Sequence, residues 1–299
     1  MCRYVIGLDI GGTNIRIGGS PAENYEKVPR ESVLDGSPDQ MKKLAEFIKE
    51  YAHKYYMDLL PAAVALGFPA AIDKTRSIVL SAPNIPGLDG VNVKEELGRY
   101  LDSPVFIERD TNLLLMGDID DLGIKPDGIG IGVYVGTGIG NAVFIGDEPL
   151  AGKNGVAGEL GHIPTQGSSL RCGCGNYGCS ECYGSGVRLA AIQKEFFPET
   201  DIADLFTKHA GSSVLREFVD HIACTIDAEI NILDPDYVVL GGGVIGMKDF
   251  PKTLLEEKIH EHARKPYPDE NLNILYSKDA VENGVRGAVK LAWKKIKNQ

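Results

Sequence analysis

Three cysteines follow a histidine at close spacing, in the order His162, Cys172, Cys174 and Cys179. Three thiolates and one imidazole are a typical ligand set for a closed, tetrahedral structural Zn²⁺ site. The glycines within the Cys-x-Cys-x₄-Cys run would allow a short loop to wrap around an ion. The pattern therefore predicts a structural zinc site, in which Cys182 is a spare thiol that competes for a ligand position. Reduced cysteines without metal, or a catalytic zinc, are the alternatives.

Glycine-rich turns follow apolar segments at three places in the chain. Glycine has no Cβ, so backbone N–H groups in such turns can converge on an anion. A carboxylate beside the first turn would hold Mg²⁺, directly or through water. Three such turns favour a nucleotide over structural β-turns, although the P-loop pattern is absent from the sequence. The residues expected to bind the nucleotide and its phosphates are Asp9, Gly11, Gly12, Thr13, Asn14, Gly136, Thr137, Gly138, Gly140, Gly241, Gly242 and Gly243.

Three acidic residues have positions that suit catalysis or sugar binding. Asp110 follows a predicted strand over 105–107, and residues at that end of a strand face a cleft in open α/β sheets. A carboxylate there would deprotonate a hydroxyl nucleophile during phosphoryl transfer, whereas a turn cap is the alternative. Glu159 and Glu181 flank the proposed zinc loop, which would hold both carboxylates rigidly for binding pairs of sugar hydroxyls.

The elements that position these residues repeat along the chain. The run from Ile6 to Thr13 lines up, 125 residues later, with the run from Ile131 to Gly138. Each is an apolar strand, a Gly/Thr turn and a second apolar strand, which indicates internal duplication and two related α/β halves with a hinge near residue 113. Strands are predicted over 3–8, 62–68, 105–107 and 237–240, and helices over 40–55, 187–196, 214–233 and 287–296.

Composition limits the class of protein. The 299 residues include 31 Lys and Arg against 42 Asp and Glu, and this net charge of -11 argues against electrostatic binding of nucleic acid. An apolar content of 43% supports a full core. The uncharged stretch 128–146 has the length of a membrane span, but its glycines and alternating pattern predict strands and a turn. With no secretory signal, we expect a reducing, cytoplasmic location.

Five segments together resemble the ROK family of sugar kinases and repressors. They are DIGGTNIRIG, VGTGIGN, GVAGELGHIP, CGCGNYGCSE and LDPDYVVLGGGV, and they occur in the family's order between residues 6 and about 245. The resemblance implies an α/β, actin-like ATPase fold, with two ribonuclease-H-like lobes around a central cleft. The N-terminal lobe would be residues 1–112 with a C-terminal helix over about 285–299. Residues 113–284 would form the C-terminal lobe, which contains the zinc knuckle. The resemblance also implies that two copies of the chain form a homodimer.

The resemblance also implies roles for individual residues. Asp110 would take the proton from the sugar's 6-hydroxyl as this oxygen attacks the γ-phosphate of MgATP. Glu159, His162 and Glu181 would bind the sugar. His162 would in addition bind zinc through its other ring nitrogen. The implied cofactors are ATP, Mg²⁺ and structural Zn²⁺.

One position departs from the pattern of many family glucokinases. These have Asn immediately before the catalytic Asp, whereas this chain has Arg109, which cannot replace an amide's paired donor and acceptor. The chain looks most like D-allose kinases in four features. They are Arg109 itself, the run through Asn112, the segment Ala82–Pro86 and the short gap between His162 and Cys172. Asn84, Arg109 and Asn112 are then further expected sugar contacts.

We therefore expect an ATP-dependent kinase for the 6-hydroxyl of an aldohexose, with D-allose as the first candidate. The alternatives are a ROK kinase for glucose, fructose, mannose or N-acetylmannosamine, and a sugar sensor without catalysis. A repressor is disfavoured, because the first glycine hairpin begins within ten residues of Met1 and leaves no room for a DNA-reading domain.

Overall fold

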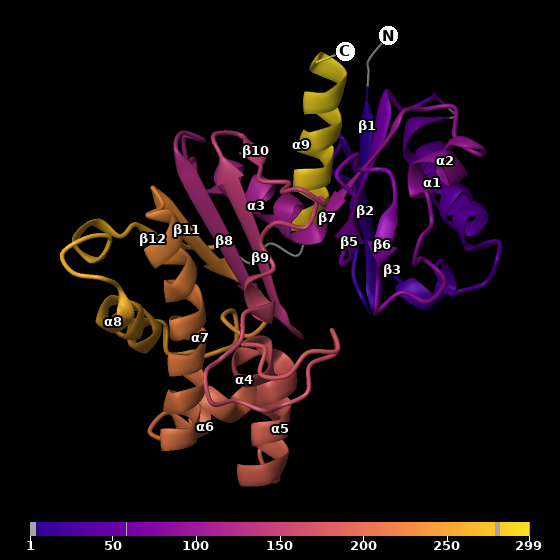
Figure 1. Ribbon diagram of the computed structural model, residues 1–299. Helices are drawn as coiled ribbons and strands as arrows, with labels where there is room; N and C mark the ends of the chain where they lie inside the picture. Colours follow the sequence, from indigo (N-terminus) through magenta and orange to yellow (C-terminus); the bar gives the residue numbers. More distant parts are fainter. Residues whose placement is uncertain (1–3, 58, 279–281, 299) are drawn as a thin grey trace. The chain divides into compact units, whose positions relative to one another are not determined.

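The computed structural model describes residues 4–57, 59–278 and 282–298, and the chain forms two compact units (Figure 1). The first unit contains the chain up to Ile124, the segment Ala151–Ala157 and the C-terminal helix. The second contains Lys125–Leu150 and the long segment that starts at Gly158. Arg3, where the first strand was expected to begin, lies outside the described residues.

A five-stranded sheet forms the centre of the first unit. Its strands, in spatial order, are β3 (Glu26–Pro29), β2 (Asn14–Ser20), β1 (Val5–Ile10), β4 (Ala63–Phe68) and β7 (Val105–Arg109). The hairpin β1–β2 is antiparallel, and Ile10 pairs with Ile15 next to the glycine turn. β1, β4 and β7 are parallel. β4 is buried along its whole length, as expected for a continuous apolar run in the middle of a parallel sheet.

The second unit repeats this arrangement. Its five strands, in spatial order, are β10 (Glu148–Pro149), β9 (Ile139–Ile145), β8 (Ile129–Val135), β11 (Tyr237–Gly241) and β12 (Ile274–Tyr276). Here too the first two strands in sequence form an antiparallel hairpin, and the strands that follow are parallel to the first of them. The predicted duplication is therefore confirmed.

The uncharged stretch 128–146 contains the hairpin β8–β9, and within the described ranges no helix has the length and apolar character needed to cross a bilayer.

Helices cover the sheet of the first unit. They are α1 (Gln40–Tyr56), α2 (Val93–Gly98), α3 (Asp110–Asp121) and α9 (Asn283–Lys297), with the short turn η1 (Arg30–Ser32) and the small hairpin β5 (Ala71–Ile72) and β6 (Val79–Ser81). α1 buries the apolar stripe that its helical spacing predicts, including Leu44 and Ile48. α9 packs against β1, β2, β4 and α3. A Cβ at Gly287 of α9 would lie 1.9 Å from the carbonyl oxygen of Leu113, so glycine is needed for this helix contact.

The expected hinge near residue 113 is wrong. Residue 113 lies inside α3, which continues the first unit to Ile124. Leu113, Leu115 and Met116 of this helix are buried, and Asn283 of α9 donates a hydrogen bond to Asp118 at 2.7 Å. The packing of α3 on α9 therefore keeps the helix in the first unit.

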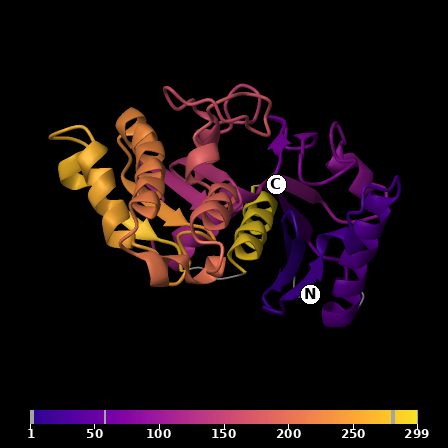
Figure 2. The same cartoon turned by 90° about the horizontal axis from the view of Figure 1, so that it is seen from below.

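The helices of the second unit start and end within one residue of the predicted bounds where the sequence predicts them. They are α4 (Glu181–Gly184), α5 (Gly186–Phe196), α6 (Leu205–His209), α7 (Ser213–Leu233) and α8 (Lys252–His262), with the short turns η2 (Leu160–His162), η3 (Ile202–Asp204) and η4 (Asp269–Asn271). α7 buries Phe218, Ile222 and Ile226 in the core of this unit. The view in Figure 2 shows α7 and α8 side by side.

Candidate active site

Asp110 lies where strand β7 ends and helix α3 begins. Arg109 has extended backbone angles and Asp110 is the first helical residue, so the carboxylate lies at the carboxyl end of a parallel strand, as predicted. The side chain is half-buried, and its Oδ1 accepts a hydrogen bond from the backbone N–H of Thr111 at 2.8 Å. The first turn of α3 thus fixes the orientation of this carboxylate.

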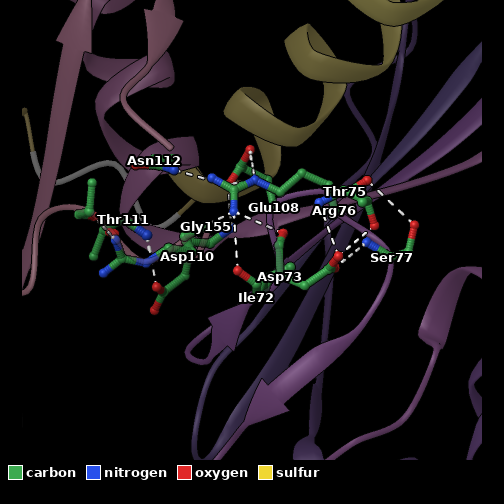
Figure 3. Close-up of polar contacts among 12 residues, drawn as sticks. Ile72, Asp73, Thr75, Arg76, Ser77, Glu108, Asp110, Thr111, Asn112 and Gly155 are labelled. Carbon is green, nitrogen blue, oxygen red and sulfur yellow. Dashed lines mark hydrogen bonds and ion pairs between the residues drawn. The ribbon is translucent and has the colours of Figure 1, made fainter. Parts of the chain in front are cut away.

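The buried carboxylate of Glu108 joins the elements around Asp110 (Figure 3). Its Oε1 accepts hydrogen bonds from the backbone N–H of Arg109 and from Nδ2 of Asn112, both at 2.9 Å. Its Oε2 accepts a hydrogen bond from Nε of Arg76 at 3.0 Å. Because Glu108 bonds to residues on both sides of Asp110, it holds the end of β7 and the first turn of α3 in one geometry.

Arg76 in turn holds the segment Ala151–Ala157 in the first unit. Its Nη1 donates to the carbonyl oxygen of Gly155 at 2.8 Å, and the guanidinium of Arg109 donates to that of Ala157. A Cβ at Gly155 would lie 2.3 Å from the carbonyl oxygen of Ile72, and the φ of this glycine is +87°. Two arginines and one glycine therefore fix this segment beside β5.

The turn that carries Arg76 is built by Asp73. Its Oδ1 accepts hydrogen bonds from the backbone N–H groups of Ser77 and Ile78, at 2.9 and 2.7 Å. Burial raises the pKa of Asp73, but these hydrogen bonds and those from Thr75 outweigh it and lower the pKa to about 2. The ionised aspartate thereby stabilises a turn in which Arg76 has a φ of +54°.

The three additional sugar contacts expected in this unit differ in their surroundings. Arg109 is 8% exposed and bonds to Ala157, and Asn112 is 3% exposed and bonds to Glu108. Asn84 is exposed, and its Cβ lies 3.7 Å from where a Cβ of Gly12 would be.

The sequence did not predict Arg76 and Glu108 as positioning residues. Glu108 belongs to a polar run that is visible in the sequence. No local sequence pattern, however, indicates that Arg76 forms an ion pair with it.

The first glycine turn connects β1 to β2. The N–H of Gly11 donates to the carbonyl oxygen of Asn14 at 2.8 Å, while Gly12 and Thr13 are exposed. Asp9 pairs with Arg16 across the hairpin, with Oδ2 and Nη1 3.1 Å apart. Burial raises the pKa of Asp9, and Arg16 opposes that shift.

The second and third glycine turns line one pocket in the second unit. This pocket, of about 470 Å³, is lined by Gly136, Thr137, Gly186, Val187, Ala190, Gly243 and Val244. Three of these residues belong to the first turns of α5, whose N-terminus favours an anion. Gly242 has a φ of +94°, and a Cβ there would lie 2.6 Å from the carbonyl oxygen of Val135. The structure therefore brings these two predicted phosphate turns together.

Four of the glycines expected in the second and third turns lie outside the lining of this pocket, namely Gly138, Gly140, Gly241 and Gly242. Gly140 and Gly241 lie within β9 and β11. A Cβ at Gly138 would be 2.5 Å from Oε2 of Glu181, so this glycine gives the carboxylate room.

The four expected zinc ligands come together in the second unit. The ligand atoms of His162, Cys172, Cys174 and Cys179 all lie within 4.8 Å of one another, and Cys182 is not part of this group. Sγ of Cys174 and Sγ of Cys179 are 3.6 Å apart, and Sγ of Cys172 is 3.7 Å from Nδ1 of His162. Zn–S bonds of about 2.3 Å in a tetrahedron place two sulfur atoms about 3.8 Å apart, so the group has the dimensions of a zinc site.

The two carboxylates beside this cluster contact different ring nitrogens of His162. Oε2 of Glu159 lies 3.7 Å from Nε2, and Oε1 of Glu181 lies 3.6 Å from Nδ1. Oε1 of Glu181 also accepts a hydrogen bond from the thiol of Cys172 at 3.0 Å. Nδ1 of the imidazole thus faces the cysteines, while Nε2 faces the exposed Glu159.

The paired sheets of identical strand order and the glycine turns between their strands define a class, the actin-like ATPase fold. The chain belongs to the ROK family, whose model matches residues 5–295. It is similar to N-acetyl-D-glucosamine kinase of Vibrio cholerae, with 30% identity over 94% of this chain and 97% of that protein.

Two solved structures are also similar over nearly the whole chain. The ROK hexokinase of Thermus thermophilus is 26% identical with a TM-score of 0.82, over 99% of this chain and 100% of that one. The ROK family glucokinase of Streptomyces griseus, in complex with glucose and AMPPNP, is 25% identical with a TM-score of 0.77, over 97% of this chain and 99% of that one.

Proposed function

We propose that the protein is an ATP-dependent sugar kinase that transfers the γ-phosphoryl group of ATP to the 6-hydroxyl of an aldohexose. The observation that carries the proposal is the placement of Asp110. Its half-buried carboxylate begins α3 at the end of β7, and the buried Glu108 network fixes both elements. A fixed carboxylate of this kind is what general-base catalysis of phosphoryl transfer requires.

In the proposed reaction, Asp110 accepts the proton of the 6-hydroxyl while this oxygen bonds to the γ-phosphorus. The bond from the γ-phosphorus to the bridging oxygen breaks, and ADP leaves with that electron pair. Mg²⁺, held by Asp9 directly or through water, would neutralise negative charge on the transferring phosphate. Asp110 then returns the proton to solvent, so the enzyme ends in its starting state.

The glycine turns serve the nucleotide in this proposal. The pocket lined by Gly136, Thr137 and Gly243 also includes residues from the first turns of α5. Glycine turns and the N-terminus of a helix both suit the negative charge of phosphates. The exposed turn Gly11–Thr13 would contact the phosphate that is transferred.

The knuckle cluster would hold a structural Zn²⁺ through Cys172, Cys174, Cys179 and Nδ1 of His162. Nε2 of His162, Glu159 and Glu181 would then bind sugar hydroxyls. The supporting observation is that Nε2 faces Glu159 while Nδ1 faces the cysteines. A metal that fixes one nitrogen also fixes the direction of the other, because the imidazole ring is rigid.

The contacts of Arg109, Asn112 and Asn84 bear on the choice of hexose. Arg109 is one of the features that make the sequence resemble D-allose kinases. In the structure its guanidinium donates to the carbonyl oxygen of Ala157, and Asn112 donates to Glu108. Both residues therefore have partners that suit a positioning role, while the exposed Asn84 is the better candidate for sugar contact. Two of the similar proteins are named for glucose and N-acetyl-D-glucosamine, which makes these sugars the main competitors of D-allose. The homodimer stays a prediction.

The experiment is ADP release from MgATP with a panel of hexoses that includes D-allose, D-glucose, N-acetyl-D-glucosamine and N-acetyl-D-mannosamine. The proposal expects one aldohexose to give a kcat/KM at least about tenfold above the others, because hydrogen-bonding sites discriminate strongly between epimers. Sugar binding without ADP formation, from protein that also binds ATP, would instead support a sugar sensor.

A further inference from the structure

A second group of metal-ligating side chains lies between helices α7 and α8, which run side by side in the second unit (Figures 1 and 2). Nε2 of His262 is 3.0 Å from Oδ1 of Asp220 and 3.2 Å from Sγ of Cys224. All three ligand atoms lie within 4.8 Å of one another. This group shares no residue with the knuckle cluster.

The helices explain why these atoms converge. Asp220 and Cys224 are four residues apart in α7, so they lie on one face of that helix, and His262 is the last residue of α8. The same nitrogen, Nε2, faces both the carboxylate and the thiol. In a catalytic triad the two ring nitrogens take different partners, so this geometry does not suit a nucleophile and its base. Three donor atoms around one point instead suit an ion.

A buried carboxylate beside the group indicates that a positive charge belongs there. Asp227 lies on the same stripe of α7, one turn after Cys224, and is 5% exposed. Its Oδ2 accepts a hydrogen bond from Asn231 at 2.6 Å, but its Oδ1 has no hydrogen-bond partner among the residues that the structure describes. Burial raises the pKa of Asp227, and the proximity of His262 and the hydrogen bond with Asn231 oppose that shift. A buried carboxylate oxygen without a partner is costly.

We propose that Asp220, Cys224 and His262 bind a divalent transition-metal ion of the zinc type. Imidazole, thiolate and carboxylate together are the donors that Zn²⁺ takes in proteins, and their mixture disfavours Mg²⁺ and Ca²⁺. The fourth position is taken by water. Bonds of about 2.0–2.3 Å to the ion would separate the donor atoms by about 3.4–3.6 Å, so the two distances from Nε2 of His262 would lengthen by only a few tenths of an ångström.

The cation that competes for this position is Lys258. Its Nζ lies 3.6 Å from Oδ1 of Asp220 and 2.6 Å from Oε2 of Glu261. Because the lysine bonds more closely to Glu261, it can stay on that partner when the ion binds Asp220. The bound ion would link α7 to α8 and stabilise the folded second unit, since it binds the native arrangement and not the unfolded chain.

The test is the number of zinc ions per chain, measured by mass spectrometry of the dialysed full-length protein after incubation with Zn²⁺. The wild-type chain should hold one ion more than Cys224→Ser and one more than His262→Gln. His260→Gln is the matched control, because His260 lies on α8 but pairs with Asp269, and it should keep the wild-type number. The difference between variants is the readout, so the result does not depend on what the knuckle holds.

Cobalt provides a second readout of the same ligands. Wild-type protein titrated with Co²⁺ should give a thiolate-to-cobalt absorption band for the second ion, and Cys224→Ser should lose that band while its circular dichroism stays native. Both variants should retain sugar-dependent ADP release. Equal metal content in wild type and both variants, or an undiminished thiolate band in Cys224→Ser, would overturn the proposal. Either result would show that Asp220, Cys224 and His262 only form hydrogen bonds between α7 and α8.

Discussion

Nε of Arg76 donates a hydrogen bond to Oε2 of Glu108 at 3.0 Å, and this pair ties the turn between β5 and β6 to the strand end that precedes Asp110. Glu108 is 4% exposed, so the ion pair has little water around it. Breaking one half of such a pair leaves the other charge without compensation. The orientation of the proposed catalytic base therefore depends on a largely buried ion pair formed by two other residues.

Replacing Glu108 by glutamine should lower the free energy of unfolding by about 3 kcal/mol, because the guanidinium of Arg76 loses its ionic partner. The measurement is chemical denaturation, with kcat followed in parallel. Glu95→Gln is the control, since Glu95 of α2 forms an exposed pair with Arg99, which follows the helix, and its loss should cost about 0.5 kcal/mol or less. Equal effects in the two variants would contradict the positioning role of Glu108.

The stability of the protein should fall as pH rises from about 5 to 8 because of Glu229. Burial raises the pKa of this side chain to about 7, although its hydrogen bond with Asn141 opposes the shift. Between the ordinary pKa of a glutamate in the unfolded chain and this raised pKa in the folded protein, the folded state binds more protons than the unfolded state. The free energy of unfolding therefore decreases by about 3 kcal/mol as pH rises through this range.

Glu229→Gln should remove this pH dependence and be more stable than the wild type at pH 8. Glu217→Gln, on the exposed face of the same helix, should keep the wild-type profile. Denaturation curves at several pH values provide the comparison. A wild-type profile that stays parallel to that of Glu229→Gln would show that Glu229 does not titrate in this range.

Loss of the proposed zinc ion from the knuckle should lower kcat/KM for the sugar more than it weakens ATP binding. Without the ion, Nδ1 of His162 loses the group that fixes the ring, and Nε2 no longer has a set direction toward the sugar. We expect Cys174→Ser to lose one zinc ion and at least about tenfold in kcat/KM for the sugar. Cys182→Ser should keep both, because Cys182 is not among the clustered ligands. Loss of zinc with unchanged sugar kinetics would separate the metal from the sugar site.

A methyl group at Gly242 should destabilise the second unit. The φ of +94° and the 2.6 Å approach to the carbonyl oxygen of Val135 leave no room for a Cβ. We expect Gly242→Ala to lower the free energy of unfolding by about 2 kcal/mol, whereas Gly243→Ala, with open space around its Cβ, should cost about 1 kcal/mol or less. Thermal denaturation of the two variants tests this, and similar melting temperatures would contradict it.

The duplicated sheets were predictable because their signals are local. Apolar alternation followed by a Gly/Thr turn marks each hairpin, and the four knuckle residues lie close together in the sequence. α3 was missed because its burial depends on α9, which follows about 160 residues later, as in the bond from Asn283 to Asp118. The partner of Glu108 was not predictable either, since Arg76 lies 32 residues away in a turn.

The second metal group shows the same limit. Asp220 and Cys224 have helical spacing that a sequence shows, but His262 comes from α8, which no sequence pattern here predicted. Long-range packing therefore decides which of several polar residues meet. In this chain it also decides that the segment Ala151–Ala157 joins the first unit rather than the second.

The most direct test of Asp110 as the catalytic base is the turnover of Asp110→Asn with the best sugar of the panel. Asparagine has nearly the same size but cannot accept the hydroxyl proton, so kcat should fall by about 10²–10⁴-fold. Melting temperature and sugar affinity should stay close to the wild-type values, and Asp102→Asn, at an exposed position, should keep full activity. Near-normal turnover in a folded Asp110→Asn protein would contradict the assignment of Asp110 as the catalytic base.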